Sequence, residues 1–272
     1  MKVVQLKDGR RLAYREAGRG RPLVLLHGWS LSAAVFTEVL PAMADNFRVM
    51  APDLRGHGGT ENGSGYLLDD FVDDLRQWLD ALGITECDLL GWSLGGQVAM
   101  RLCTLLPARV GRLLLVSTTP RFLAEEEAGW IYGLPKGQVK AMERGLRRRY
   151  RETLEDFFNR QFGSDELSAK RREQVLAFSF NGDEGGIPEV EVAQAALHTL
   201  CSGDLRAELI GLKMPALVLH GERDEIIPVA AGRYLADHLP NAIFAGLNSA
   251  GHAPFLTRLD RCCDIFREFL QA

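Results

Sequence analysis

One short segment of the chain places a serine where it could act as a nucleophile. Residues 89–100 read LLGWSLGGQVAM, so Ser93 lies between Gly91 and Gly95, where an apolar run passes into helix-forming residues. A G-x-S-x-G sequence at a tight strand-to-helix turn can expose the serine hydroxyl, since the glycines leave room for it. An ordinary glycine-rich turn would give the same pattern, because glycine is a common residue. The partners available to Ser93 must decide between the two interpretations.

A serine hydroxyl needs a base to remove its proton and a third group to orient that base. In hydrolases with such a turn, the acid follows a late strand and the histidine lies near the C-terminus. Asp224 follows the apolar run ALVLHG and precedes Pro228, with Glu222 as its main rival. His252 follows the small residues SAG, where a bend could present its ring. We therefore predict a catalytic triad of Ser93, His252 and Asp224.

The remaining histidines are weaker candidates for the base. His27 ends a strand directly before a glycine, a position suited to shaping the backbone, and His57 lies in a glycine-rich loop. His198 belongs to a charged helical segment, His220 closes a strand, and His238 has the pattern of an exposed helix residue. Each of these positions favours a structural role.

Cleavage of an ester also needs hydrogen-bond donors for the negative charge that develops on the carbonyl oxygen. The backbone N–H of Leu94, directly after Ser93, is one expected donor. The loop LLHGWS makes the N–H of Trp29 the other, although an ordinary strand-end turn is the alternative there. The helix that begins near Leu94 would also direct the positive end of its dipole towards the site.

Composition indicates an ordinary soluble globular protein. The 272 residues are 46% hydrophobic and 25% charged, with a net charge of −4 that favours neither nucleic acid nor a membrane surface as a partner. No run of about 18 apolar residues is present, and the N-terminal MKVVQLKDGR lacks the apolar core of a signal peptide. The five cysteines form no C-x-x-C pair, which is typical of free thiols in a reducing cytoplasm. We expect a cytoplasmic monomer with no metal site and no cofactor.

The elements that must position these residues follow from the hydrophobic pattern. Buried-strand and helix patterns alternate over residues 22–118 and again over 214–272, which predicts a mostly parallel sheet with helices on both faces. Between them, residues 121–203 lose the strand signal and become helical and charged. We therefore predict an α/β core of residues 1–120 and 204–272, with a helical insertion at 121–203.

The predicted insertion has its own charge. Residues 136–172 contain eleven Lys and Arg residues and six Asp and Glu residues, so this stretch has a net charge of about +5, whereas the whole chain has a net charge of −4. Most charged helix faces are simply solvated. A basic face on an otherwise acidic protein could instead steer an acidic partner.

Taken together and in order, the segments LLHGWS, DLRGHG, GWSLGG, HGERDEIIP and GHAPF resemble the α/β-hydrolase superfamily along the whole chain. Within it, the HGW, GWSLGG and HAPF segments are most similar to the pimeloyl-[acyl-carrier protein] methyl ester esterases of biotin synthesis. This resemblance implies a serine esterase that cleaves a methyl ester on a carrier-bound dicarboxylate chain and releases methanol.

The resemblance also implies which residues contact the substrate. Trp29, Ser93, Leu94 and His252 would line the acyl site, and the segment FFNRQ is similar to one that contacts the acyl chain, with Phe157 and Gln161 at the matching positions. Both could equally be ordinary core and surface residues of the insertion. Acyl carrier proteins are acidic, so the basic insertion suggests a docking surface. Its candidate residues are Arg147, Arg148, Arg149, Arg151 and Arg172.

Rival functions share the same triad or the same fold. A broad carboxylesterase, a lactonase or a carbon–carbon bond hydrolase would need the same three residues, because a fold alone does not choose a substrate. A hydrolase-fold receptor that only binds a small molecule is a rival from another class. Turnover that depends on Ser93 would exclude the receptor.

Overall fold

A computed structural model describes residues 1–163, 165–180 and 186–272. Its centre is one eight-stranded sheet with the strand order β1-β2-β4-β3-β5-β6-β7-β8. The strands are β1 (Lys2–Gln5), β2 (Arg11–Ala17), β3 (Arg21–Leu26), β4 (Phe47–Pro52), β5 (Cys87–Trp92), β6 (Val110–Val116), β7 (Ala216–Gly221) and β8 (Ala242–Leu247). From β4 to β8 every pair of neighbours is parallel, whereas β1 and β2 are antiparallel to their neighbours. The predicted mostly parallel α/β sheet is confirmed.

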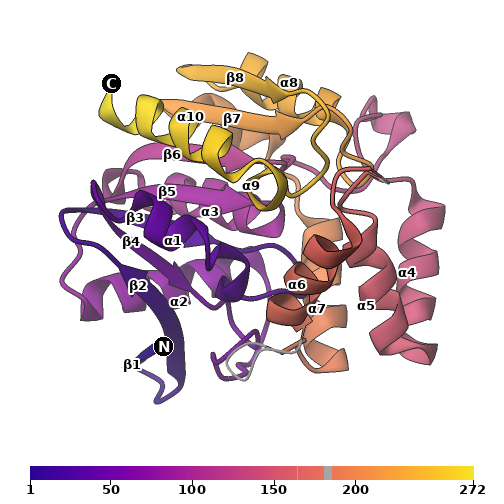
Figure 1. Ribbon diagram of the computed structural model, residues 1–272, viewed down its shortest axis with the longest axis horizontal. Coiled ribbons are helices and arrows are strands. Elements are labelled where there is room, and N and C mark those ends of the chain that lie inside the picture. The colour runs from indigo at the N-terminus through magenta and orange to yellow at the C-terminus, as the bar shows by residue number, and fades with distance from the viewer. Residues whose placement is uncertain (164, 181–185) are drawn as a thin grey trace.

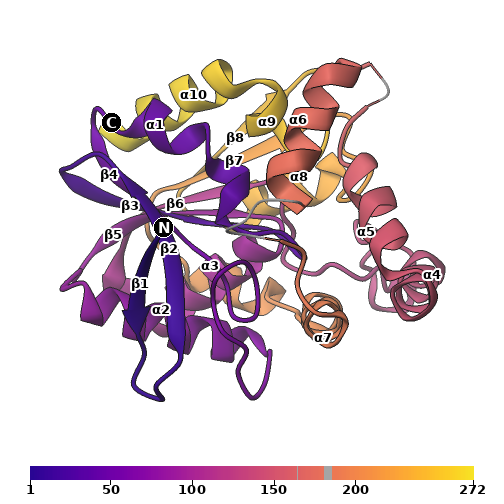
Figure 2. The same cartoon turned by 60° about the horizontal axis from the view of Figure 1, so that its bottom comes forward.

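Helices lie on both faces of this sheet. The α-helices are α1 (Val39–Met43), α2 (Leu68–Ala81), α3 (Leu94–Leu105), α4 (Lys136–Arg148), α5 (Tyr150–Asn159), α6 (Ala169–Phe180), α7 (Val190–Ser202), α8 (Val229–His238), α9 (Pro254–Thr257) and α10 (Leu259–Gln271). Helices α1 and α10 pack together on one face, and α2 and α3 pack together on the other (Figures 1 and 2). No helix in the described ranges is long and apolar enough to cross a membrane.

The central strands are buried because helices cover them on both sides. All six residues of β5 and all six of β7 are buried, as expected for strands that read as continuous apolar runs. Parallel strands end at the same edge of a sheet, so the loops that follow β3, β5 and β7 meet there. Those loops contain Trp29, Ser93 and Asp224 respectively.

The segment between β6 and β7 contains α4 to α7, which lie together beside the sheet at the right of Figure 1. We call residues 121–203 the insert; residues 164 and 181–185 of it lie outside the described part of the chain. Its first fifteen residues differ from the prediction that the whole segment is helical. They form isolated bridges, Leu123 with Leu134 and Glu125 with Trp130, and Gly129 turns the chain with a φ of 70°. Helix α4 begins only after Pro135, because glycine and proline disfavour a helix interior.

Candidate active site

The turn around Ser93 is tight and leaves no room for side chains on either side. Strand β5 ends at Trp92, Ser93 has φ 56° and ψ −119°, and α3 begins at Leu94. A Cβ on Gly91 would lie 2.4 Å from the carbonyl oxygen of Gly95, and one on Gly95 would lie 2.3 Å from that of Leu26. A left-handed φ is costly for serine, and such strain is found mainly where a structure uses it. The two glycines are therefore a steric requirement of this turn.

Asp224 and His252 meet although 28 residues separate them. Nδ1 of His252 lies 2.8 Å from Oδ2 of Asp224, and both side chains are buried. The other carboxylate oxygen, Oδ1, accepts hydrogen bonds from the backbone N–H groups of Ile226 and Ile227, both at 2.8 Å. The carboxylate is thus held in one orientation, with one oxygen on the backbone and the other facing the imidazole.

The groups around the carboxylate of Asp224 stabilise its negative charge. Burial alone would raise the pKa of Asp224, but the attraction of His252 and hydrogen bonds from His220 and His252 hold that pKa well below its usual range. An ionised carboxylate at this position favours a proton on Nδ1 of His252, which leaves Nε2 free to accept one. Nε2 would then be the basic nitrogen.

His220 also contacts the carboxylate, which the sequence analysis did not anticipate. Its Nε2 lies 3.2 Å from Oδ2 of Asp224 and 2.9 Å from the carbonyl oxygen of Ile227. The spacing of four residues between His220 and Asp224 was the feature of the sequence that could have indicated this contact. Glu222, the rival acid, is exposed and pairs with Arg233 at 3.2 Å.

The loop that carries His252 lies against the nucleophile turn. Nε1 of Trp92, the residue before Ser93, donates to the carbonyl oxygen of His252 at 2.8 Å, and the two rings are 5.6 Å apart. The N–H of His252 donates to the carbonyl oxygen of Gln161 in the insert, also at 2.8 Å. The structure therefore places the loop of the predicted base against Trp92, the residue before the predicted nucleophile, and bonds that loop to the insert.

The loop after β3 approaches Ser93 closely. A Cβ on Gly28 would lie 3.2 Å from the Cβ of Ser93. The carbonyl oxygen of Gly28 accepts from Nδ1 of His27 at 2.9 Å, while Nε2 of His27 accepts from the N–H of Leu54 at 2.9 Å. The carbonyl of Gly28 and the N–H of Trp29 belong to the same peptide group and point in opposite directions. Because His27 holds the carbonyl, the N–H of Trp29 points away from His27. Within the described residues, the backbone N–H groups of Trp29 and Leu94 have no acceptor.

Two spaces are lined by residues of the insert. A narrow gap with no room for a water molecule, here called the inner cavity, is lined by Trp29, Ser30, Leu31, Leu154, Phe157, Phe158, Gln161 and Phe180. Besides the indole of Trp29, whose Nε1 donates to the carbonyl oxygen of Ala193, the polar side chains of this lining are Ser30 and Gln161. Both Ser30 Oγ and Gln161 Oε1 are buried and have no hydrogen-bond partner among the described residues. The predicted contact residues Phe157 and Gln161 thus lie beside Trp29.

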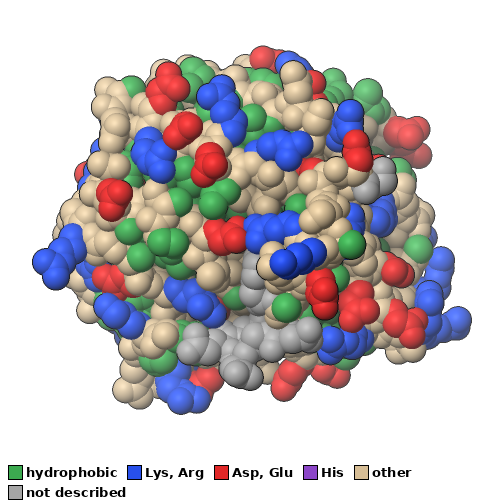
Figure 3. Space-filling model, in the orientation of Figure 1, with side chains coloured by type: hydrophobic (Ala, Val, Ile, Leu, Met, Phe, Trp, Pro, Cys, Tyr) green, Lys and Arg blue, Asp and Glu red, His purple; other side chains and the backbone are tan. Residues whose placement is uncertain are grey.

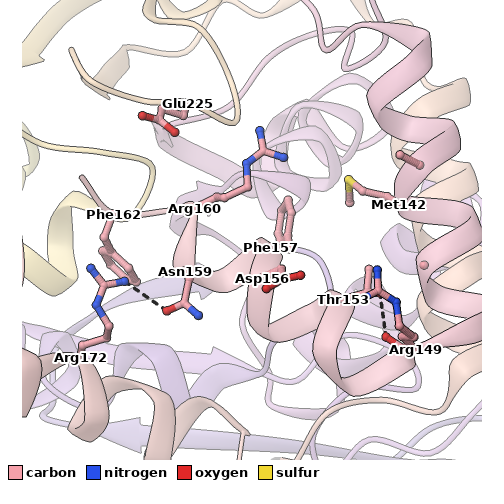
Figure 4. Close-up of a pocket in the computed structure, with 12 residues that line it drawn as sticks. Met142, Arg149, Thr153, Asp156, Phe157, Asn159, Arg160, Phe162, Arg172 and Glu225 are labelled. Atoms are coloured by element: carbon pink, nitrogen blue, oxygen red, sulfur yellow. Dashed lines mark hydrogen bonds between the residues drawn. The ribbon is translucent and has the colours of Figure 1, made fainter. Parts of the chain in front are cut away.

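The larger space is a surface groove of about 680 Å³ between α4 and α5, with Glu225 of the core also in its lining (Figure 4). Arg149, Arg160 and Arg172 line it together with Asp156. Phe157 lines both the groove and the inner cavity, and its ring meets that of Trp29 edge to face at 4.9 Å. Phe157 therefore forms the wall between the groove and the inner cavity.

The predicted docking arginines differ in their surroundings. Arg149, directly before α5, and Arg151 within it form ion pairs with Glu152 and Glu155 of α5, while Arg172 donates to Asn159 at 3.1 Å. In the described part of the chain, Arg147 and Arg148 are exposed and have no ion pair. On the face shown in Figure 3, basic and acidic side chains are interspersed over the insert, at the right of the view. The basic residues thus form no single patch on that face.

The two buried histidines near the loop after β4 are neutral. Burial and the neighbouring His57 lower the pKa of His27 to about 3, and burial lowers the pKa of His57 to about 4. Their ring centroids are 5.4 Å apart, and Nε2 of His57 has no hydrogen-bond partner in the described part of the chain. Neither ring can gain a proton in the folded state without a large cost.

These two histidines make the protein less stable at mildly acidic pH. Their unfolded-state pKa is near 6.5, so below that pH the unfolded chain binds protons that the folded chain does not. The free energy of unfolding should fall between pH 7.5 and pH 5, by about 2 kcal/mol for each histidine. Urea unfolding at the two pH values measures this loss. In the variant His57→Gln, the free energy of unfolding should fall between the two pH values by about half as much as in the wild type. In the exposed variant His198→Gln it should fall as much as in the wild type. Equal falls in all three proteins would refute the conclusion that His27 and His57 are neutral in the folded protein.

The described residues contain no group of three or more His, Cys, Asp or Glu side chains placed to hold a metal ion. The chemistry that the site offers is nucleophilic. A hydroxyl, an imidazole and an ionised carboxylate are available, together with the backbone N–H groups of Trp29 and Leu94, for which the described residues provide no acceptor.

Comparison with known proteins gives consistent matches over most of the chain. Residues 21–259 match the model of the alpha/beta hydrolase fold. The pimeloyl-[acyl-carrier protein] methyl ester esterase of Nitrosomonas europaea is 35% identical over 241 residues, which are 88% of this chain and 92% of that protein. The enzyme of the same name from Chromobacterium violaceum is 34% identical over 88% of this chain and 90% of its own.

A solved structure agrees with these matches at the level of the fold. An esterase from Exiguobacterium antarcticum superposes with a TM-score of 0.91 over 99% of both chains, at 22% identity.

Proposed function

The chain belongs to the alpha/beta hydrolase family, and we propose that it is a serine esterase for the methyl ester of a pimeloyl chain on an acyl carrier protein. Curated relatives with this activity in their names are 30–35% identical over most of the chain, and the chain is a carboxylic ester hydrolase. The observation that carries the mechanism is the hydrogen bond between His252 and the buried Asp224, beside the strained turn of Ser93.

In the first half of the proposed reaction, Oγ of Ser93 attacks the ester carbonyl carbon while Nε2 of His252 takes the hydroxyl proton. The N–H groups of Trp29 and Leu94 stabilise the negative oxygen of the tetrahedral intermediate. As the intermediate collapses, His252 returns the proton to the leaving oxygen, and methanol departs from the acyl-enzyme.

In the second half, a water molecule loses a proton to His252 and attacks the acyl-enzyme. Collapse of the second intermediate releases the free carboxylic acid and returns the proton to Ser93. Asp224 holds the imidazole in the tautomer with the proton on Nδ1 and stabilises its charged form. Its depressed pKa supports this role, because the carboxylate remains charged at the pH of the reaction.

We also propose that residues 121–203 act as a cap whose Phe157 and Gln161 contact the acyl chain. Two features support this: both side chains line the inner cavity, and that cavity borders Trp29. The five free cysteines support a reducing, cytoplasmic setting. A single species of the mass of one chain in sedimentation analysis would support the proposed monomer.

The test of the substrate compares kcat/KM on pimeloyl-carrier methyl ester with kcat/KM on a short soluble ester. A strong preference for the carrier-bound ester supports the proposal. Cleavage of only the short ester would retain the esterase mechanism and refute the carrier-bound substrate.

Docking of an acidic carrier protein gives a separate prediction. The double variant Arg147→Glu/Arg148→Glu should raise KM for the carrier-bound ester roughly tenfold, equivalent to about 1.4 kcal/mol, because two unpaired positive charges become negative. KM for the short ester should not change, and added salt should reduce the difference between variant and wild type. The matched control Arg19→Glu/Lys213→Glu makes the same charge change at exposed positions outside the insert. An equal rise in KM in the control would exclude specific docking.

A further inference from the structure

Glu166 of the insert contacts the loop that carries His252. Its Oε1 and Oε2 both lie 3.0 Å from the N–H of Gly251, and Oε1 accepts from the hydroxyl of Thr257 at 2.6 Å. Oε2 also accepts from the N–H of Gly163, at 2.9 Å. One carboxylate thus collects three donors, two of which lie on either side of His252.

The backbone at His252 depends on the insert for its hydrogen bonds. The N–H of Gly251 is bonded to Glu166, and the next N–H, that of His252, is bonded to the carbonyl oxygen of Gln161. Within the described residues, neither N–H has an acceptor in the core. The approach is close: a Cβ on Gly251 would lie 2.4 Å from that carbonyl oxygen and 2.9 Å from Oε2 of Glu166.

We propose that Glu166 is a positioning residue that couples the insert to the catalytic base. Its carboxylate fixes Gly251 and Thr257, so that the ring of His252 stays in line with Asp224 on one side and Ser93 on the other. A carboxylate suits this position because it only accepts hydrogen bonds and has lone pairs for all three donors. The inference rests on the proposed role of His252 as the base.

Loss of this carboxylate should reduce the rate of the chemical step more than substrate binding. In Glu166→Ala the N–H of Gly251 loses its acceptor and the hydroxyl of Thr257 keeps only the long hydrogen bond to the carbonyl oxygen of Pro254, at 3.4 Å, so a displacement of His252 by a fraction of an ångström follows. We expect kcat on a short soluble ester to fall roughly 10- to 100-fold, the scale of a misplaced catalytic group. KM should stay within about threefold of the wild-type value, because Glu166 does not line the inner cavity.

Two further variants separate positioning from general stability. Glu166→Gln keeps an oxygen for the N–H of Gly251 and an amide that can donate to Thr257, so it should restore kcat to within about fivefold of wild type. Asp165→Ala is the matched control, because this neighbouring carboxylate is 76% exposed and, among the described residues, forms an ion pair only with Arg223, at 3.6 Å. It should leave kcat unchanged. If Glu166→Ala does not fold, Thr257→Val removes one of the three donors and should lower kcat by a smaller factor.

The proton resonance of the hydrogen bond between His252 and Asp224 provides a readout that does not depend on turnover. It should shift or broaden in Glu166→Ala and remain unchanged in Asp165→Ala. A wild-type kcat and an unchanged resonance in the folded Glu166→Ala or Thr257→Val variant would overturn the proposal, as would an equal loss in Asp165→Ala. Retained activity in Ser93→Ala would instead refute the proposed function, so the two failures are distinguishable.

Discussion

Replacing Ser93 by alanine is expected to lower kcat for ester cleavage by roughly 10⁶-fold, the loss seen when other serine hydrolases lose their nucleophile. The variant removes only the hydroxyl. Alanine keeps the Cβ, and Gly91 and Gly95 still give it the space that the turn requires. Without Oγ no acyl-enzyme can form, so the remaining rate comes from the N–H groups of Trp29 and Leu94 acting on a direct attack by water.

The measurement is steady-state release of methanol from the carrier-bound ester and of alcohol from a short ester. The loss should be the same for both substrates, because the nucleophile serves both. Ser117→Ala is a matched control: Ser117 also has a left-handed φ, 43°, and a buried hydroxyl with no hydrogen-bond partner among residues 1–163, 165–180 and 186–272. Its activity should remain within about threefold of wild type. A Ser93→Ala protein that retains more than about a thousandth of the activity would refute the nucleophile.

Replacing Asp224 by asparagine is expected to lower kcat by roughly 10⁴-fold, as in other triads whose acid is changed in this way. The surroundings of the carboxylate explain why. Two backbone N–H groups, those of Ile226 and Ile227, require an acceptor at the position of Oδ1. The asparagine carbonyl must take that position, so its amino group faces His252.

An amino group opposite Nδ1 reverses the tautomer of His252. Nδ1 must then accept a hydrogen bond, the proton moves to Nε2, and Nε2 can no longer take the proton of Ser93. The loss should appear in kcat with little change in KM, and it should be present across the whole pH range above the pKa of Asp224, which lies well below the usual range. The control is Glu222→Gln at the rival acid, which is exposed and paired with Arg233. If Glu222→Gln lost as much activity as Asp224→Asn, the assignment of the acid would be wrong.

The local pattern of the sequence predicted the elements that position the site. Apolar runs predicted the buried strands that end near Leu26, Trp92 and Gly221, and the helix patterns that alternate with them predicted the helices on both faces of the sheet. The turn at Ser93 was also predictable, because its requirement for glycine on both sides is met by residues two positions away. In each case the physical cause lies within a few residues of its effect.

The tertiary structure decided how distant residues meet. The sequence predicted that Asp224 and His252 act together, but only the folded chain gives the 2.8 Å contact and adds His220 to the same carboxylate. The tertiary structure also shows which arginines form ion pairs, since Arg149 and Arg151 pair with acids one turn away. It places Glu166 within hydrogen-bond distance of Gly251, although 85 residues separate them.

The physical reason for this division is the range of the interactions. Strand, helix and turn preferences depend on backbone sterics and on the alternation of apolar residues, which neighbours in the sequence determine. The loops after β3, β5 and β7 come together because parallel strands end at one edge of the sheet, so the sequence could predict that neighbourhood. The hydrogen bonds within it depend on displacements of less than 1 Å between segments packed from opposite parts of the chain, and only the packed molecule sets those.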